Sequence, residues 1–266
     1  MAVTEIRIGR LEYLTAENIR VPHCFTTRLG GVSREHLSSL NLGMHRGDAP
    51  ENVVENFRIL GSALGFSLDD LVLTQQIHSD IVRQVSRTDA AGIDHRAYPP
   101  CDALITNDPG VALMVFTADC TPILLHDPVL GAVGAVHAGW RGTAADIAGK
   151  TVQAMMTAFG CRPENIRAAI GPNIGPCCFE TDADVPQAML QTYGIGAEQH
   201  IRPAGQKYYV NLKEINALSL RNAGVTDIAI SSACTACESH RFWSHRATQG
   251  LRGSQGAIII CQEGRS

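Results

Sequence analysis

The chain lacks the features that mark three common classes of protein. No stretch approaches the roughly 20 consecutive apolar residues that a membrane-spanning helix needs, so we expect no membrane contact. Lys and Arg form no cluster, and these 22 residues are outnumbered by 26 Asp and Glu residues, which argues against nucleic acid as a partner. No repeat, low-complexity tract or linker divides the 266 residues, so a single domain spanning residues 1–266 is predicted.

An export signal is missing as well. The first residues, MAVTEIRIGRLEYL, alternate polar and apolar side chains like a β-strand, without the basic flank and continuous apolar core of a signal peptide. We therefore predict a cytoplasmic protein. Its nine cysteines are an odd number without the spacing of a disulfide framework, and they are expected to be free thiols or metal ligands.

Three segments carry the periodicity of helices. Residues 51–65 repeat large apolar side chains every three or four positions and end at Gly65, which predicts a helix packed on a sheet. Residues 147–159 predict a second helix, with Thr143 and Asp146 as a capping pair. Its expected buried stripe consists of Ile147, Thr151, Met155, Ala158 and Phe159. Residues 212–224 are a weaker third segment.

Seven short runs rich in Val, Ile and Ala predict β-strands. They lie at residues 101–106, 110–120, 121–127, 131–139, 165–172, 226–231 and 256–261. Strands interleaved with helices indicate a layered α/β or α+β domain, in which mixed sheets are flanked by helices.

Three of these runs end abruptly in polar or glycine-rich tips. One ends at Asp119 and Cys120, another at His137, and a third at the adjacent Cys177 and Cys178. Strand ends hold side chains on a rigid base, and small residues beside them let a ligand approach the backbone. We therefore expect such tips to build a site.

His78, in the polar segment TQQIHSD, is a candidate partner of Cys120 and His137. Two imidazoles and a thiolate suit zinc and leave a fourth position open, as catalytic zinc sites do. In a second interpretation, Cys120 is a nucleophile activated by His137, with Asp119 or another carboxylate orienting the imidazole. In a third, these are ordinary buried residues. The spacing matches no compact zinc motif and leaves all three open.

Arg28, Arg141 and Arg246 each lie among Ser, Thr or Gly residues. A planar guanidinium group in such a place can hold an anion, which makes the three arginines candidate substrate-binding residues. The alternative is that each is a solvated surface side chain.

The remaining cysteines of interest are two pairs. Cys234 and Cys237 form a CxxC segment, and with the adjacent Cys177 and Cys178 they would make a four-thiolate metal site. Because adjacent cysteines chelate one ion awkwardly, buried free thiols are the favoured interpretation.

Several segments, taken in order, resemble the YfiH-type family, whose members are labelled polyphenol oxidase, laccase-domain protein or purine nucleoside phosphorylase. They are FTTRLGGVS, SLNLGMHRGD, TQQIHSDIV, CDALIT, TADCTPILLHDP, GAVHAGWRGT, AIGPNIGPCCFE and FWSHR. The combination of TADC with HAGWRG is specific. The resemblance implies a single-domain fold similar to the catalytic domain of cytotoxic necrotizing factor. It also implies a zinc ion held by His78, Cys120 and His137.

The activity implied by the resemblance is that of a purine nucleoside enzyme. It comprises phosphorolysis of adenosine, inosine and methylthioadenosine to the free base and ribose 1-phosphate, and deamination of adenosine. For deamination, a zinc-activated water would attack C6 of adenine while Asp119 moves protons. For phosphorolysis, Arg28 and Arg246 would hold phosphate near C1′ of the ribose.

Three alternatives accompany this function. They are a metal-free cysteine hydrolase or amidase that uses Cys120 and His137, a copper-dependent polyphenol oxidase, and a non-enzymatic nucleotide- or metal-binding module. Copper is the second candidate metal, but none of the ten histidines forms the His-x-His pairs of a multicopper oxidase. The chain also reads SHRATQG where many family members carry S-Y-R-R followed by Asp, which affects the contacts expected of Arg246.

Overall fold

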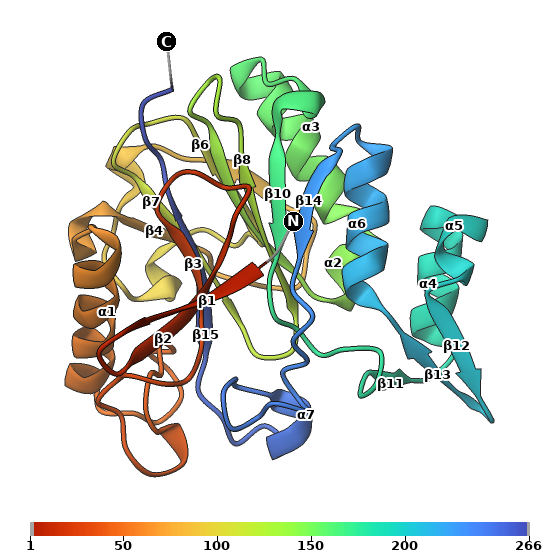
Figure 1. Cartoon of the computed structure of the whole chain (residues 1–266), viewed down its shortest axis with the longest axis horizontal. Helices are drawn as coiled ribbons and strands as arrows, with labels where there is room; N and C mark the ends of the chain where they lie inside the picture. The colour runs from red at the N-terminus through yellow and green to blue at the C-terminus, as the bar shows by residue number, and fades with distance from the viewer. Residues whose placement is uncertain (1–2, 265–266) are drawn as a thin grey trace.

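Two six-stranded sheets pack face to face and are covered on their outer faces by helices (Figure 1). The computed structural model describes residues 3–264. Leu113 and Ile258 of the first sheet and Leu104 and Leu124 of the second belong to one continuous buried core. The predicted layered α/β arrangement of mixed sheets and helices is therefore confirmed, whereas the likeness to cytotoxic necrotizing factor stays a prediction.

The first sheet has the strand order β1, β2, β3, β15, β7, β4. Its strands are β1 (Val3–Ile8), β2 (Leu11–Ala16), β3 (His23–Thr26), β15 (Gln255–Ile260), β7 (Ala112–Thr117) and β4 (Leu71–Leu73). All neighbours are antiparallel except β4 and β7, which run parallel. Every residue of β15 is buried, as expected of a strand in the middle of a sheet that is covered on both faces.

The second sheet has the strand order β14, β10, β8, β9, β6, β5. Its strands are β14 (Asp227–Ile230), β10 (Arg167–Ile170), β8 (Thr121–His126), β9 (Val133–Ala138), β6 (Ala103–Thr106) and β5 (Val82–Gln84). The β8–β9 pair is antiparallel and places Pro122 opposite His137. Cys120, two residues before Pro122, is thereby held beside the end of β9.

The helices cover the outer faces of the two sheets. The helix α1 (Pro50–Leu64) buries Phe57 and Leu60 against the first sheet and ends at Gly65, whose φ of 80° is left-handed. The helices α3 (Ile147–Phe159) and α6 (Leu212–Asn222) pack on the second sheet. These are the three helices that the periodicity predicts. The described residues also contain five short 3₁₀ helices: η1 (Glu35–Leu37), η2 (Leu68–Asp70), η3 (Arg87–Asp89), η4 (His95–Ala97) and η5 (Pro163–Asn165).

The start of α3 differs from the prediction. Thr143 lies inside the short helix α2 (Trp140–Ala144) and is not a cap of α3. Asp146 occupies the N-cap position, but its backbone is left-handed, with a φ of 61°, and its side chain accepts no hydrogen bond from α3. That carboxylate instead accepts hydrogen bonds from the hydroxyl groups of Tyr193 and Ser219. Ala158 is exposed, so the predicted buried stripe ends earlier, at Met155.

A small lobe lies beside α6 (Figure 1). It consists of α4 (Asp184–Tyr193), α5 (Ile195–Glu198) and an antiparallel sheet of β11 (Glu180–Thr181), β13 (Lys207–Val210) and β12 (Ile201–Ala204). Its own core is formed by Val185, Met189, Ala197 and Val210. The last helix, α7 (His245–Thr248), follows the loop after β14.

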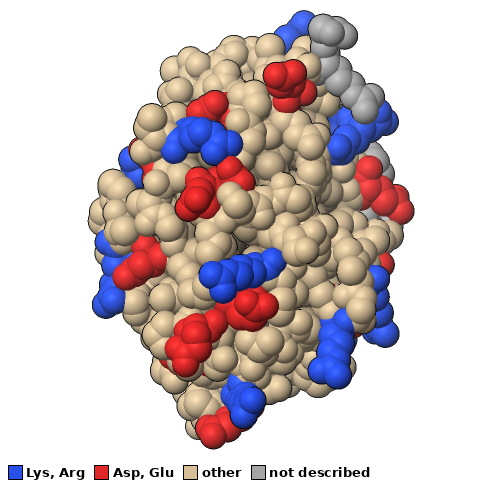
Figure 2. All heavy atoms as spheres, turned by 90° about the vertical axis from the view of Figure 1, so that its left-hand side faces the viewer, with Lys and Arg blue, Asp and Glu red and all other residues tan. Residues whose placement is uncertain are grey.

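Charged side chains of both signs are interspersed on the face of the molecule that carries α1 (Figure 2). One ion pair on α1 joins Arg58 to Glu55, with 3.7 Å between Nη1 and Oε2. Within residues 3–264, no helix is both long enough and apolar enough to cross a membrane.

Candidate active site

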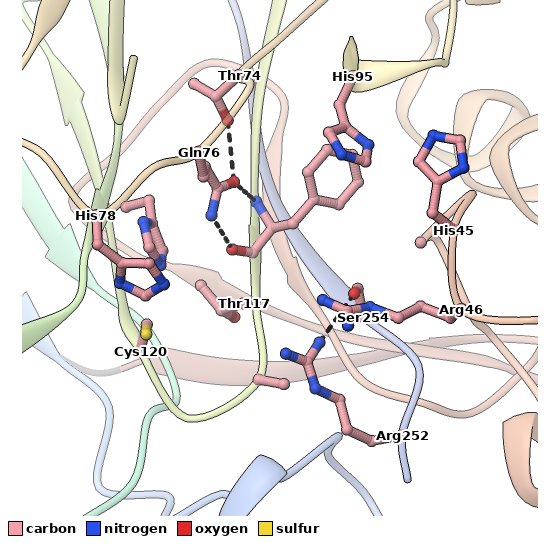
Figure 3. A pocket seen from close by; sticks show the side chains of 14 residues that line it. His45, Arg46, Thr74, Gln76, His78, His95, Thr117, Cys120, Arg252 and Ser254 are labelled. Atoms are coloured by element: carbon pink, nitrogen blue, oxygen red, sulfur yellow. Dashed lines mark hydrogen bonds between the residues drawn. The ribbon is translucent and has the colours of Figure 1, made fainter. Parts of the chain in front are cut away.

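A cavity of about 300 Å³ opens at the ends of β7 and β9 (Figure 3). Its walls come from the segment before α1, the loop after β4, the turn between β7 and β8, η4, and the segment before β15. The polar lining residues are His45, Arg46, Thr74, Gln76, His78, His95, Thr117, Cys120, His137, Arg252 and Ser254. A cavity of this size lies at the lower end of the range for small-molecule sites.

The structure brings His78, Cys120 and His137 together on one wall of the cavity. Their candidate ligand atoms all lie within 4.8 Å of one another, and the two imidazole centroids are 4.9 Å apart. Two of the turns involved have unusual backbones, since His78 has a φ of 59° and Asp119, directly before Cys120, a φ of 87°. Non-glycine residues seldom adopt such values, and when they do they often mark functional sites.

Gly139 is the residue that leaves room for this trio. A Cβ atom at this position would lie 2.6 Å from Nδ1 of His78 and 3.4 Å from Sγ of Cys120. Any other residue would therefore push into the space between the candidate ligands.

Asp102, at the start of β6, organises the trio from behind. Its fully buried carboxylate lies 2.8 Å from Nδ1 of His137 and accepts hydrogen bonds from the backbone N–H groups of His78 and Ser79, at 3.1 and 2.7 Å. With Nδ1 engaged by Asp102, Nε2 of His137 is the nitrogen left for a ligand. Asp102 is not among the site residues predicted from the sequence, although a carboxylate at the start of the buried run CDALIT is a signal for it.

The electrostatics of the trio favour a cation at its centre. Burial alone would lower the pKa of His137, but the sulfur of Cys120 and the carboxylate of Asp102 raise it to about 9. Burial would likewise raise the pKa of Asp102, but hydrogen bonds from His137 and Ser79 lower it to about 2. Burial and the neighbouring His137 lower the pKa of His78. One positive charge, whether a proton or a metal ion, is therefore stabilised here.

The residues present fit a metal ion. One sulfur and two imidazole nitrogens are the donor set of catalytic zinc sites, in which a fourth position stays open. The contact between Asp102 and His137 is the carboxylate–histidine pairing that orients a metal-bound imidazole. Binding of a metal by His78, Cys120 and His137 stays a prediction, and the geometry agrees with it.

Arg46 and Arg252 approach the opposite side of the cavity near Ser254 (Figure 3). The guanidinium of Arg252 donates to the carbonyl of Gly253 and to the hydroxyl of Ser254, at 3.0 and 3.1 Å, while its Nε is buried without a partner. Burial and the neighbouring Arg46 lower the pKa of Arg252 to about 10. Among residues 3–264, no carboxylate forms an ion pair with either guanidinium. This wall is therefore suited to an anion.

The three arginines expected to bind substrate do not line this cavity. Arg28 donates to the carbonyls of Ser38 and Ser239 and stacks on the ring of Trp243. Arg246 donates to the backbone carbonyls of Cys178 and of Glu180, the first residue of β11. The guanidinium of Arg141 lies over the ring of Trp140.

A substrate-binding role for Arg28, Arg141 and Arg246 thus stays a prediction, and the structure offers Arg46 and Arg252 in a better position. The signal that identified the first three also marks the segments HRGD and LRGS, where an arginine precedes a glycine. The sequence contains many such positions, and only the fold shows which of them face a cavity.

Asp119 also faces away from the cavity lining. Its carboxylate accepts hydrogen bonds from the hydroxyl of Thr235 at 2.6 Å and from the backbone N–H of Arg246 at 2.7 Å. These bonds hold the strained turn that presents Cys120. A role for Asp119 in proton transfer stays a prediction, and its observed contacts are those of a positioning residue.

The four remaining cysteines of interest come together about the loops that follow β10 and β14. The candidate ligand atoms of Cys177, Cys178, Cys234 and Cys237 all lie within 4.8 Å of one another. Only Cys234 is buried, while Cys177 and Cys237 are exposed. The four cysteines are free, as expected, but the expectation that they are buried is wrong for Cys177 and Cys237. They come together because the parallel pairing of β10 and β14 places the loops after both strands at one end of the sheet.

Fold and site together define a layered α/β protein whose cavity combines a candidate metal centre with a wall suited to an anion. The chain belongs to the YfiH/YlmD family, because a family model described as multi-copper polyphenol oxidoreductase laccase matches residues 22–262. It is 40% identical to the purine nucleoside phosphorylase YlmD of Geobacillus stearothermophilus, covering 88% of each chain. It is also 40% identical to a purine nucleoside phosphorylase of Deinococcus radiodurans, covering 94% of this chain and 92% of that one.

The solved structures agree with this family. The crystal structure of YlmD from Geobacillus stearothermophilus matches with a TM-score of 0.91 at 36% identity and covers 98% of this chain and 100% of that chain. A structure of the Bacillus licheniformis protein YfiH matches with a TM-score of 0.90 at 33% identity, covering 96% and 97% of the two chains.

Proposed function

We propose that the protein is a zinc-dependent purine nucleoside phosphorylase acting on adenosine, inosine and methylthioadenosine. The observation that carries the proposal is the two-sided cavity, in which Cys120 and the two histidines face Arg46 and Arg252. A phosphorylase must hold a neutral nucleoside and an anion side by side, and this cavity supplies one wall for each. Relatives named purine nucleoside phosphorylase at 40% identity support the same reaction class.

In phosphorolysis, the bond between C1′ and the purine nitrogen breaks, a bond between C1′ and a phosphate oxygen forms, and the base leaves with a proton. Arg46, Arg252 and Ser254 would hold the phosphate, since two guanidinium groups without carboxylate partners and a hydroxyl suit its oxygens. His78, Cys120 and His137 would hold the zinc, which supplies a Lewis acid when bound. Asp102 keeps His137 in the tautomer that presents Nε2.

Deamination of adenosine, in which water adds at C6 and the 6-amino group leaves as ammonia, is proposed as a second reaction of the same cavity. It needs no phosphate. Loss of the arginine wall should therefore weaken phosphorolysis more than deamination, which gives an internal control within one protein.

The test compares base release from adenosine and inosine with and without phosphate, for the wild type and for Arg46→Met, Arg252→Met and Arg141→Met. A charge-assisted hydrogen bond is worth about 1.5–3 kcal/mol, so loss of Arg46 or Arg252 should lower kcat/KM for phosphorolysis by roughly 10- to 100-fold. Arg141→Met removes a guanidinium that lies outside the cavity and so tests the sequence-based role of Arg141 separately: an unchanged kcat/KM would remove Arg141 from the substrate-binding residues. Base release that proceeds equally well without phosphate would contradict the proposal.

A second candidate function is a metal-free cysteine hydrolase or amidase. One observation favours it: the three side chains that a cysteine hydrolase needs lie next to one another. Cys120 would be the nucleophile, His137 the base and Asp102 the carboxylate that orients the base, with 2.8 Å between His137 Nδ1 and Asp102 Oδ1. Removal of metal by chelation, followed by addition of zinc, separates the two functions. Nucleoside phosphorolysis should disappear and return with zinc, whereas a cysteine hydrolase would stay active without metal and be inactivated by iodoacetamide.

A further inference from the structure

We propose that Cys177, Cys178, Cys234 and Cys237 form a second, structural zinc site, separate from the cavity. Neither the family description nor the names of the relatives assign a metal to these residues. The proposal is independent of the nucleoside activity, because it concerns only what the four sulfur atoms hold.

The spacing of the sulfur atoms suits one metal ion. Cys237 Sγ lies 3.5 Å from Cys177 Sγ and 3.4 Å from Cys178 Sγ, and all four sulfurs lie within 4.8 Å of one another. Tetrahedral zinc with Zn–S bonds of about 2.3 Å places its sulfurs about 3.8 Å apart, a value that lies between the shortest observed distance of 3.4 Å and the upper limit of 4.8 Å. A disulfide, with S–S of about 2.05 Å, would pair two sulfurs and leave the other two unexplained.

The backbone around the sulfurs is already arranged for close approach. The backbone N–H of Gly175 donates to Cys234 Sγ at 3.1 Å. A Cβ atom on Gly175 would lie 3.3 Å from Cys177 Sγ and 3.4 Å from Cys234 Sγ, which is tight. The two loops are joined by a hydrogen bond of 2.9 Å from the N–H of Thr235 to the carbonyl of Asn173. The ligand-bearing loops are thus positioned by contacts other than those between the sulfurs.

Buried positive charge beside the cluster points to an anionic group there. Lys213 is only 6% exposed, and its ammonium donates to the carbonyls of Ser231 and Ala233, at 2.7 and 2.6 Å. Within the described residues 3–264, it forms no ion pair with a carboxylate. The guanidinium of Arg246 also donates to the carbonyl of Cys178, at 2.9 Å. A zinc ion with four thiolates carries a net charge of about −2, which the buried Lys213 and the exposed Arg246 would offset.

The proposed site would clamp two segments that support the active-site turn. Thr235, which follows Cys234, donates to Asp119, and the N–H of Ile174, shortly before Cys177, donates to the carbonyl of Asp119. Asp119 precedes Cys120 in the strained turn. With four protein ligands the site has no open position, so its role is to hold these loops and not to bind substrate.

Zinc content of protein purified under reducing conditions with zinc chloride tests the proposal. We expect about two zinc ions per chain in the wild type, about one in His78→Ala/Cys120→Ala, about one in Cys177→Ser/Cys237→Ser, and none in the combined variant. The Cys177 and Cys237 side chains are exposed, so their replacement leaves the core intact, and circular dichroism verifies the fold. Cys161→Ser, outside the cluster, is the matched control and should keep both ions.

Cobalt(II) substitution in the His78→Ala/Cys120→Ala background gives a second readout. Four thiolates on one tetrahedral cobalt should produce strong sulfur-to-metal charge-transfer absorption, which Cys177→Ser/Cys237→Ser should abolish. The proposal is overturned if the folded Cys177→Ser/Cys237→Ser protein keeps the full zinc content of the wild type. It is equally overturned if mass spectrometry of freshly isolated protein shows disulfides among the four cysteines and no metal.

Discussion

At the scale of single residues, the geometry of the candidate site depends on two residues that are not predicted ligands. Gly139 provides no ligand, yet a side chain there would occupy the gap between His78 and Cys120. Asp102 does not line the cavity, yet its buried carboxylate aligns His137 and the turn that carries His78. Such residues define the geometry of the candidate metal site without being among its predicted ligands.

Replacement of Gly139 by alanine should therefore weaken metal binding sharply. The new methyl group would lie 2.6 Å from Nδ1 of His78, so the imidazole must move. We expect zinc affinity to fall by roughly 10- to 100-fold, as for other losses of support around a metal. Competition with a chromogenic chelator measures this.

The matched control is Gly134→Ala, in the strand β9 that ends directly before Gly139. Its methyl group would meet neighbours at 3.5 Å, which is ordinary van der Waals contact. Equal zinc affinity in Gly139→Ala and Gly134→Ala would contradict the role given to Gly139.

His126 offers a test of pH dependence away from the site. This buried residue at the end of β8 has an Nδ1 without a hydrogen-bond partner. Burial first, and then the positive charges of Arg167 and His23 against the opposing Asp127, lower its pKa to about 4. The unfolded chain binds the proton more tightly than the folded one. The contribution of neutral His126 to the free energy of unfolding is therefore complete above about pH 6.5 and is lost as the pH falls toward 4.

The expected loss from His126 is about 2–3 kcal/mol between pH 6.5 and pH 4. Urea unfolding at several pH values measures it as the difference between the wild type and His126→Gln, which should shrink or reverse as the pH falls. The exposed His240→Gln serves as the control and should follow the wild type throughout. Parallel pH profiles for all three proteins would refute the assignment.

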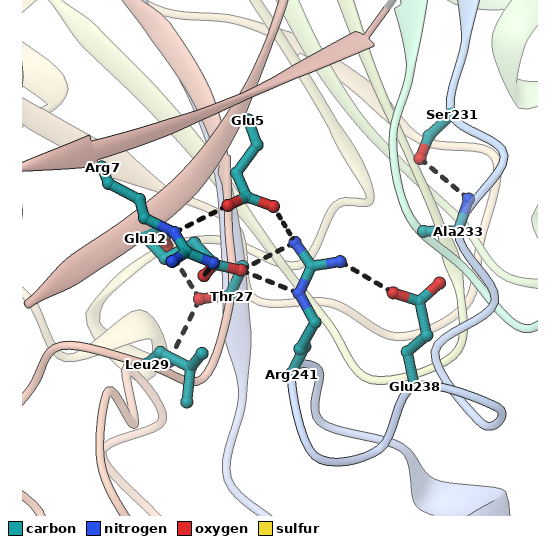
Figure 4. Close-up of polar contacts among 9 residues, drawn as sticks. All are labelled: Glu5, Arg7, Glu12, Thr27, Leu29, Ser231, Ala233, Glu238 and Arg241. Atoms are coloured by element: carbon teal, nitrogen blue, oxygen red, sulfur yellow. Dashed lines mark hydrogen bonds and ion pairs between the residues drawn. The ribbon is translucent and has the colours of Figure 1, made fainter.

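At the scale of elements, one ion-pair network fastens the N-terminal hairpin to the loop that carries two of the four clustered cysteines (Figure 4). Arg241 contacts Glu12 at 2.7 Å, Glu5 at 2.6 Å and Glu238 at 2.8 Å. Arg7 adds a contact to Glu12 at 2.9 Å. The Glu12 side chain is only 5% exposed, so this one carboxylate is largely withdrawn from water, whereas the Arg7 side chain is 68% exposed and that of Arg241 23%.

Arg241→Met should destabilise the protein by about 2–4 kcal/mol, because it leaves the buried carboxylate of Glu12 with fewer partners. The double variant Arg241→Met/Glu12→Gln should recover part of the loss, since the uncompensated charge is then removed. Chemical denaturation of the three proteins measures both effects.

The control for Arg241 is the exposed pair Arg87–Asp70, whose Arg side chain is 53% exposed. Arg87→Met should cost less than about 1 kcal/mol. If Arg241→Met costs no more than Arg87→Met, the network does not fasten the hairpin.

At the scale of the whole molecule, the sequence predicts the elements better than their arrangement. All seven apolar runs contain a strand and the three periodic segments contain a helix. Both can be predicted because the spacing of apolar residues along a short segment distinguishes a strand from a helix. The three-residue strands β4 and β5 are too short to carry such a pattern. Which strands pair is decided by packing between distant segments, which no local window contains.

The candidate site divides in the same way. His78, Cys120 and His137 were found because residue chemistry and the family resemblance both mark them. Arg46, Arg252 and Asp102 were missed because an arginine or a carboxylate becomes functional only through what faces it. The clustering of the four cysteines likewise depends on β10 and β14 being parallel neighbours, which the sequence does not reveal.

The place of β15 bears on how the protein is made in the cell. This strand joins β3 to β7, and its Gly256 bonds to Thr26, 230 residues earlier in the chain. Until the ribosome has added the residues of β15, β3 and β7 each have one edge whose backbone N–H and C=O groups lack their partners in β15. Such edges are prone to pair with other chains. Translation therefore leaves the first sheet divided until residues 255–260 emerge, and a nascent chain stalled before that point is an open template for aggregation.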